Sequence, residues 1–298
     1  MLHSKNWYGA FTAIATPFRD GKVDYNSLAR LVAHQIDGGI RGIVPCGTTG
    51  EAPTLTEKEH HEVVEFVVKE VNRRCLVVAG TGSNSTAAAM DKTRHARDAG
   101  ADAALIVSPY YNKPTQEGIF RHYEAIAKAA TGLPIILYDI PGRTGISIDV
   151  DTCVRLAEID NIVAVKEAAG KPERITALRS LTSLSLLSGD DALTIPFMSL
   201  GASGVISVAS NIVPTEIVAM VSAASEGRYA EARAIHDKLT PLFRALFVES
   251  NPTPVKFALE RCGIIKSGEV RLPLVAPGEK TKKEMLLALE HSGCVTLA

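Results

Sequence analysis

The chain has 298 residues, of which 46% are hydrophobic and 22% charged, and its formal net charge is −1. This length suits one barrel domain with an extension, and the absence of any basic block argues against nucleic acid or an acidic membrane as a partner. Five widely spaced cysteines without a C-x-x-C pair argue against a disulfide framework and a structural zinc site. Residues 1–8 contain no apolar signal-peptide core, and no apolar run is long enough to span a bilayer, so we expect a cytoplasmic protein.

Short apolar runs rich in Val, Ile and Leu recur along the chain, each followed by a turn that contains Gly, Ser or Pro. Most of them lack polar alternation, which is typical of strands buried on both faces of a parallel sheet. The eight predicted strands cover residues 11–15, 42–46, 76–80, 103–108, 135–139, 162–166, 184–188 and 204–208.

Amphipathic segments between these runs predict helices at residues 27–38, 56–71, 85–99, 116–130 and 147–157. Thr56 and Glu59 form a capping-box pattern at the start of the second helix, and Gly100 is expected to end the third. Eight alternating units with right-handed crossovers predict an α/β protein with a closed TIM (β/α)8 barrel. An open doubly wound sheet is the main alternative, but no G-x-G-x-x-G follows the first strand.

The strand pattern stops after about Gly227, and residues 229–247, 254–262 and 280–291 read as further helices. We therefore predict a barrel catalytic domain at residues 1–227 and a C-terminal helical extension at residues 228–298 that packs on it. No low-complexity linker separates the two parts.

Catalytic groups of such barrels lie at the carboxyl ends of the strands. Lys166 ends the sixth predicted strand, where burial would disfavour the charged ammonium and free the amine as a nucleophile. A lysine that extends from the strand end to water is an equally good interpretation of this position alone. Tyr138 ends the neighbouring strand, where its phenol either transfers protons or only packs its ring.

Three loops offer groups that suit carboxylates or a neighbouring subunit. Thr48 and Thr49 lie between glycines and can present N–H and O–H groups to a carboxylate, although a plain strand-to-helix turn also fits. Arg143, in a tight loop beyond Tyr138, can grip a carboxylate with two hydrogen bonds or stay on the surface. Tyr111 follows Tyr110, and one ring of this pair can reach a site while the other packs at an interface.

An amine, a phenol and two carboxylate-binding groups suit aldol-type addition through an enamine. The iminium is the electron sink of this reaction, so neither a metal nor another cofactor is expected. The strand ends carry no cluster of His, Asp and Glu with the spacing of metal ligands. His60 and His61 are adjacent on a predicted helix, and adjacent helical residues do not face the same site.

Six motifs, in order along the chain, together resemble the dihydrodipicolinate synthase family within the wider N-acetylneuraminate lyase superfamily. The resemblance runs from residue 9 to residue 256. The motifs are GTTGE at 47–51, SPYYNKPTQEG at 108–118, YDIPGRTG at 138–145, VKEAAG at 165–170, LLSGDD at 186–191 and GVISV at 204–208.

The resemblance implies a role for each candidate residue. Lys166 would form a Schiff base with pyruvate, and Tyr138 would transfer protons together with Thr48 and with Tyr111 from a neighbouring subunit. Thr49 and Thr48 would hold the pyruvate carboxylate, and Arg143 would hold the carboxylate of L-aspartate 4-semialdehyde. The remaining positions that match the pyruvate site are Gly189 and Ile206.

The product implied by the resemblance is 4-hydroxy-tetrahydrodipicolinate, at the entry to diaminopimelate and lysine synthesis. The expected assembly is a homotetramer built as a dimer of dimers, although the family includes dimers. The alternative is an N-acetylneuraminate or 2-keto-3-deoxy-sugar-acid lyase on the same scaffold, against which Arg143 argues because such substrates need neutral hydroxyl contacts there. A metabolite-binding barrel without catalysis would be expected to lack the lysine or the tyrosine.

The sequence departs from the family pattern at two places. Asp139 stands where many members have Asn, and it adds a possible negative charge near the barrel mouth. In the lysine-feedback site of inhibited members, the matching residues are Asn84, His60 and Tyr110, whereas the departures are Ala52 for a serine, Glu57 for a histidine and Ala88 for an acid. Loss of the acid removes a partner for the lysine amine, so we expect weak or absent inhibition by L-lysine.

Overall fold

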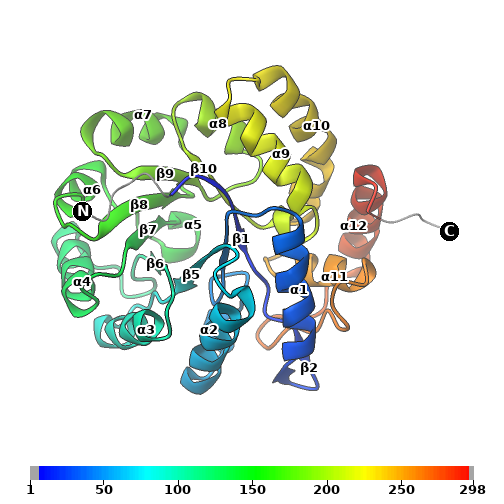
Figure 1. Cartoon of the computed structure of the whole chain (residues 1–298), viewed down its shortest axis with the longest axis horizontal. Helices are drawn as coiled ribbons and strands as arrows, with labels where there is room; N and C mark the ends of the chain where they lie inside the picture. Colours follow the sequence, from blue (N-terminus) through cyan, green and yellow to red (C-terminus); the bar gives the residue numbers. More distant parts are fainter. Residues whose placement is uncertain (1–6, 295–298) are drawn as a thin grey trace.

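A closed barrel of eight parallel strands forms the centre of the computed structural model, which describes residues 7–294 (Figure 1). Around the barrel the strand order is β1-β10-β9-β8-β7-β6-β5-β4. The strands are β1 (Gly9–Ala13), β4 (Gly42–Val44), β5 (Leu76–Gly80), β6 (Ala103–Val107), β7 (Ile135–Asp139), β8 (Ile162–Glu167), β9 (Ser185–Ser188) and β10 (Gly204–Ser207). The predicted TIM barrel is therefore confirmed. Residues 1–6, which belong to the stretch predicted to lack a signal-peptide core, are outside the described residues.

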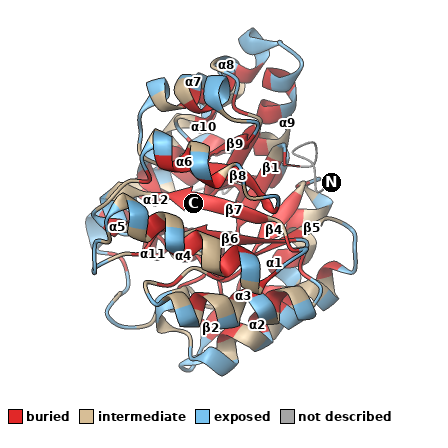
Figure 2. Cartoon of the chain, turned by 90° about the vertical axis from the view of Figure 1, so that its left-hand side faces the viewer, coloured by how far each residue is buried: buried red, intermediate tan, exposed pale blue. Residues whose placement is uncertain are grey.

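Helices surround the barrel and connect successive strands. They are α1 (Tyr25–Asp37), α2 (Glu57–Val71), α3 (Thr86–Asp98), α4 (Gln116–Ala129), α6 (Val150–Leu156), α7 (Pro172–Leu181), α8 (Thr194–Ser199) and α9 (Pro214–Ser225). Short elements lie in the loops, namely β2 (Phe18–Arg19), β3 (Lys22–Val23), η2 (Ala52–Thr54), α5 (Pro141–Thr144) and η3 (Ala209–Asn211). Figure 2 shows buried strands in the middle and helices with a buried inner face and an exposed outer face, as amphipathic sequences require.

Local sequence signals set several of the element ends. The capping box of α2 is present, since the Thr56 side chain accepts from the Glu59 N–H and the Glu59 carboxylate accepts from the Thr56 N–H. After α3, Gly100 adopts a φ of +90°, the left-handed conformation that favours glycine. The second strand of the barrel, β4, is shorter than predicted and ends at Val44, because Cys46 has a φ of +55° and leaves the strand conformation. The first strand begins two residues earlier than predicted.

Two hydrophobic layers hold the barrel together. An inner cluster fills the cylinder and includes Trp7, Phe11, Leu105, Ile136, Leu187 and Ile206. An outer cluster lies between the strands and the helices. This arrangement explains why the strand sequences are apolar without alternation, because both faces of every strand are buried.

The C-terminal extension consists of α10 (Tyr229–Ala245), α11 (Thr253–Arg261) and α12 (Glu279–Ser292). Helix α10 packs against α9 of the barrel and against α12, and α11 contacts η3. The division into a barrel domain at residues 1–227 and an extension at residues 228–298 stays a prediction. Among residues 7–294, no helix has the length and apolar character needed to cross a membrane.

Candidate active site

Lys166 and Tyr138 meet at the carboxyl ends of two neighbouring strands. They are paired in the register of β7 and β8, and the Lys166 Nζ atom lies 4.1 Å from the centroid of the Tyr138 ring. Each residue is only 5% exposed. A buried amine over a phenol ring, inside the mouth of the barrel, has the surroundings that a carbonyl-condensing nucleophile needs.

A β-bulge in β8 turns Lys166 toward the barrel interior. Ile135 pairs with Ile162, whereas the next residue, Ile136, pairs with Ala164, so Val163 is an extra residue in β8. Val163 and Ala164 both belong to the inner cluster, while the residues on either side of them, Ile162 and Val165, belong to the outer one. Because side chains alternate along a strand, an unbulged strand starting from Ile162 would place Lys166 on the outer face.

Gly189 and Ile206 line the interior beside this pair. The Gly189 N–H donates to the Glu167 carbonyl at 2.8 Å, and a Cβ at Gly189 would lie only 3.1 Å from the Lys166 Cε and 2.7 Å from the Ala168 Cβ. Glycine therefore leaves the space that the Lys166 side chain uses. Ile206 is 1% exposed and belongs to the same inner cluster as Tyr138.

The loop of residues 47–51, here called the 47–51 loop, follows β4 and is tightly folded. A Cβ at Gly50 would lie 3.0 Å from the Cys46 nitrogen, so this close approach favours glycine. The Thr16 hydroxyl donates to the Gly50 carbonyl at 2.8 Å. Thr48 is half-buried, and Thr49 is 1% exposed with its hydroxyl accepting from the Asn251 side-chain amide at 3.0 Å.

Arg143 and Tyr111 are both exposed in the single chain. Arg143 lies in α5, and its Nη2 donates to the Asn251 carbonyl at 3.3 Å. Tyr111 is 90% exposed and has a φ of +73°. Within residues 7–294 no hydrogen-bond partner of the Tyr111 hydroxyl is present, which leaves this ring available to a second copy of the chain.

Asn251, Glu51 and Lys256 contact the candidate site, yet the sequence reasoning gave them no role. Asn251 contacts both Thr49 and Arg143, and Lys256 pairs with Glu51 of the 47–51 loop. Glu51 lies in the GTTGE motif of the family resemblance, and Lys256 is the residue at which that resemblance ends. The available signal in the sequence was one acidic residue, Glu51, and one basic residue, Lys256, both within the part of the chain that resembles the family.

Asp139 does not lie at the barrel mouth, so the possible mouth charge suggested by the sequence is corrected. It follows Tyr138 directly and therefore projects from the outer face of β7, where it is fully buried. Its carboxylate pairs with the Arg174 guanidinium at 2.9 Å, and the same guanidinium pairs with Glu167 at 3.0 Å. Asp139 therefore ties β7 to the start of α7.

Burial, reinforced by the nearby Glu167 charge and opposed by Arg174, raises the pKa of Asp139 to about 6. The folded state then holds this proton more tightly than the unfolded chain. The resulting stabilisation is complete below about pH 4 and is lost as the pH rises through about 6. A carboxyl pKa raised from its ordinary value near 4 to about 6 corresponds to about 3 kcal/mol.

Asp139→Asn should remove this pH dependence. We expect the free energy of unfolding of the unmodified protein, relative to the variant, to fall by up to about 3 kcal/mol between pH 4 and pH 7. Urea unfolding of both proteins at several pH values measures the difference. A difference that stays constant over this range would contradict the prediction.

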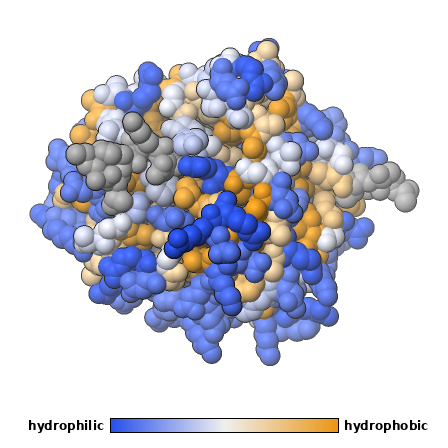
Figure 3. Space-filling view, viewed as in Figure 1, coloured by the Kyte–Doolittle hydropathy of each residue, from blue (hydrophilic) through white to orange (hydrophobic). Residues whose placement is uncertain are grey.

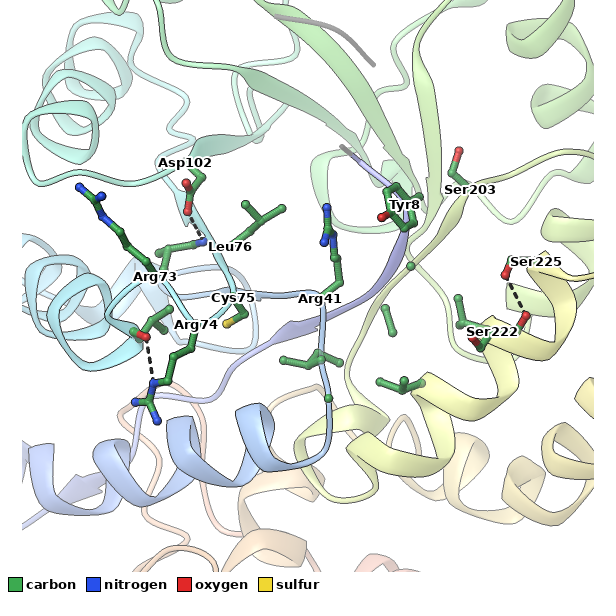
Figure 4. Close-up of a pocket in the computed structure, with 18 of the residues that line it drawn as sticks. Tyr8, Arg41, Arg73, Arg74, Cys75, Leu76, Asp102, Ser203, Ser222 and Ser225 are labelled. Atoms are coloured by element: carbon green, nitrogen blue, oxygen red, sulfur yellow. Dashed lines mark hydrogen bonds between the residues drawn. The ribbon is translucent and has the colours of Figure 1, made fainter. Parts of the chain in front are cut away.

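A large cavity lies at the other end of the barrel and is not the candidate active site. Its volume is about 1320 Å³, and its lining includes residues at the starts of strands, such as Gly9, Leu76 and Ser203 (Figure 4). Figure 4 shows Arg41 beside Tyr8, and Arg74 donates to the Val71 and Glu70 carbonyls at the end of α2. The positive charge of Arg74 therefore complements the carbonyl groups at the C-terminal end of α2.

The chemistry of this cavity also differs from that of the barrel mouth. Its thiol, Cys75, has its pKa raised to about 11 by burial, so it stays protonated near neutral pH. Figure 3 shows that strongly hydrophilic and hydrophobic residues lie side by side in the middle of the face seen in Figure 1. In the part of the chain from 7 to 294, no group of three His, Cys, Asp or Glu residues is placed to hold a metal ion.

The fold and the buried amine define a class of protein, the lyases that form a Schiff base at the mouth of a (β/α)8 barrel. A family model described as the dihydrodipicolinate synthetase family matches residues 6–292. The chain belongs to this family, which confirms the resemblance found in the sequence.

Relatives of known name agree over almost the whole chain. The 4-hydroxy-tetrahydrodipicolinate synthase of Syntrophus aciditrophicus (strain SB) is 48% identical over 96% of this chain and 99% of its own length. The solved structure of the enzyme of that name from Methylacidiphilum fumariolicum SolV is 49% identical, covers 96% of each chain and has a TM-score of 0.94. A dihydrodipicolinate synthase described as the first monomeric variant is 39% identical, with 98% of this chain and 99% of that chain covered and a TM-score of 0.95.

Proposed function

We propose that this chain is a 4-hydroxy-tetrahydrodipicolinate synthase that condenses pyruvate with L-aspartate 4-semialdehyde through a Schiff base on Lys166. The observation that carries the proposal is the buried Lys166 amine, 4.1 Å from the Tyr138 ring centroid at the carboxyl ends of β7 and β8. Family membership and the names of the relatives point to the same reaction.

The reaction starts with the Lys166 amine adding to the ketone carbon of pyruvate. Loss of water gives an iminium, and loss of a methyl proton then gives an enamine. The enamine carbon attacks the aldehyde of the second substrate, and the amino group of that substrate displaces Lys166 as the ring closes. Tyr138 is placed to move protons in these steps, because its hydroxyl-bearing ring lies against the amine.

Hydroxyl and guanidinium groups would hold the two carboxylates. Thr48 and Thr49 of the 47–51 loop would bind the pyruvate carboxylate, and Arg143 would bind that of the semialdehyde. Exposure of Arg143 suits a substrate that enters second, after the Schiff base has formed. Gly189 and Ile206 would line the pyruvate pocket, and none of these steps requires a cofactor.

A direct assay of two substrate pairs tests the proposed function. We expect product formation from pyruvate and L-aspartate 4-semialdehyde in a coupled assay, and little or no cleavage of N-acetylneuraminate. Faster cleavage of N-acetylneuraminate or of a 2-keto-3-deoxy sugar acid would favour the sister activity on the same scaffold.

The proposal also requires a homo-oligomer, a dimer or a dimer of dimers, because Tyr111 faces away from its own chain. Lys166→Ala and Tyr111→Phe chains should each have low activity alone. If Tyr111 acts in the neighbouring subunit, a mixed dimer contains one complete site, and random mixing restores about a quarter of the sites.

Refolding the two variants together and measuring activity against each variant alone tests this arrangement. A mixture that stays at the level of the Tyr111→Phe chains would mean that Tyr111 acts within its own chain. Ultracentrifugation of the refolded species shows whether oligomers have formed, and capture of an untagged chain of one variant by an affinity-tagged chain of the other shows whether they are mixed.

A further inference from the structure

A buried ion pair joins the 47–51 loop to the C-terminal extension. Lys256 Nζ donates to Glu51 Oε1 at 2.7 Å, across 205 positions of sequence, and the two side chains are 0% and 1% exposed. The same Nζ lies 4.1 Å from the centroid of the Phe18 ring. Removing two charges from water is costly, and only close pairing with further hydrogen bonds offsets that cost. The pair therefore fixes the position of Glu51 closely.

The second oxygen of the Glu51 carboxylate is also held by the extension. Glu51 Oε2 accepts from the Arg271 N–H at 2.9 Å, and the Arg271 side chain is itself held by the Glu59 carboxylate and the Thr54 carbonyl. Glu51 has a φ of +53°, a left-handed conformation that is strained for a residue with a side chain. Contacts from the extension to both oxygens hold the end of the loop in this conformation.

A third contact from the extension acts directly on the Thr49 hydroxyl. Thr49 Oγ1 accepts from Asn251 Nδ2 at 3.0 Å, and both residues are at most 5% exposed. A hydroxyl that accepts from an amide keeps its own proton free to donate elsewhere. Asn251 therefore orients Thr49 as a donor, which is the role required for binding a carboxylate.

We propose that Lys256 and Asn251 are positioning residues for the pyruvate carboxylate, so that the C-terminal extension sets the affinity of the barrel site for its first substrate. Lys256 acts through Glu51 on the shape of the 47–51 loop, and Asn251 acts on the direction of the Thr49 hydroxyl. This inference rests on the proposed binding of pyruvate by Thr48 and Thr49.

Borohydride trapping of pyruvate on Lys166, followed by mass spectrometry, measures pyruvate binding separately from the second substrate. In Lys256→Met, the pyruvate concentration for half-maximal trapping should rise about tenfold or more, because small displacements of a binding group have large effects. Asn251→Asp should have a similar effect, because the aspartate accepts from the Thr49 hydroxyl and turns its proton away from the substrate.

Two further variants separate positioning from stability. Leu289→Ala opens a cavity in α12, which packs on α10 and α11, and it should lower the melting temperature without changing the pyruvate dependence. Glu51→Gln combined with Lys256→Met removes both buried charges together, so it should fold even if the single variant does not. This double variant should regain stability while its pyruvate requirement stays raised.

Each result has a definite meaning. Wild-type dependence on pyruvate in Asn251→Asp and in the double variant would overturn the inference, whatever their melting temperatures. An equal rise in Leu289→Ala would also overturn it, since stability alone would then explain the effect. Absence of trapping in the unmodified protein would instead refute the proposed function.

Discussion

Replacing Lys166 with alanine is expected to abolish the covalent adduct with pyruvate and to lower kcat by about 10⁴-fold or more. The variant retains the pocket but lacks the only proposed group that can form an iminium, so the barrier rises by about 5 kcal/mol. In the unmodified protein, borohydride reduction with pyruvate should add one reduced pyruvate unit to the peptide that contains Lys166.

Three further variants make this experiment specific. Lys171→Ala removes an exposed lysine five residues further along, and it should trap pyruvate normally. Lys166→Arg keeps a positive charge at the strand end but offers no nucleophilic amine, so it should not trap. Tyr138→Phe keeps the ring beside the amine and should still trap on Lys166, but more slowly. An adduct on any other lysine would contradict the proposed site.

Replacing Arg143 with alanine is expected to raise KM for L-aspartate 4-semialdehyde by about 10- to 100-fold while KM for pyruvate changes little. A two-pronged hydrogen bond between a guanidinium and a carboxylate contributes about 1.5–3 kcal/mol, which corresponds to this range. The side chain is exposed and makes one hydrogen bond within residues 7–294, to the Asn251 carbonyl, so the fold should not suffer. Steady-state kinetics with each substrate varied in turn measures the two constants.

Arg143→Lys is the matched control for the Arg143 prediction. It keeps the charge but loses the planar fork, so its KM for the semialdehyde should fall between those of the unmodified protein and Arg143→Ala. Equal increases in the two KM values of Arg143→Ala would count against a role in binding the second carboxylate. That outcome would also remove the main argument against a sugar-acid lyase.

The sequence was informative where a signal is local. Unbroken apolar runs marked strands buried on both faces, and the Thr56 and Glu59 pattern marked the start of α2. The rule that catalytic groups lie at strand ends then led to Tyr138 and Lys166, which the structure brings together. Periodicity, caps and strand ends depend on neighbours in sequence, so a single chain displays them.

Features that depend on distant partners could not be predicted in the same way. The apolar sequence around Val163 does not show a bulge, because any apolar residue fits either face of a strand that is buried on both sides. Asp139 looked like a group at the mouth until its pairing with Arg174 placed it on the outer face. The β2 and β3 hairpin was too short to give a pattern.

The sequence by itself determined the barrel, the order of its strands along the chain and, for Tyr138 and Lys166, a place at the ends of neighbouring strands. The tertiary structure alone decided which way those residues face and what holds them there, including the contact of Lys256 with Glu51 across 205 positions. The physical reason is that secondary structure follows from short-range periodicity and sterics. A buried charge, in contrast, finds its partner wherever the closed fold brings one, and no local pattern records that meeting.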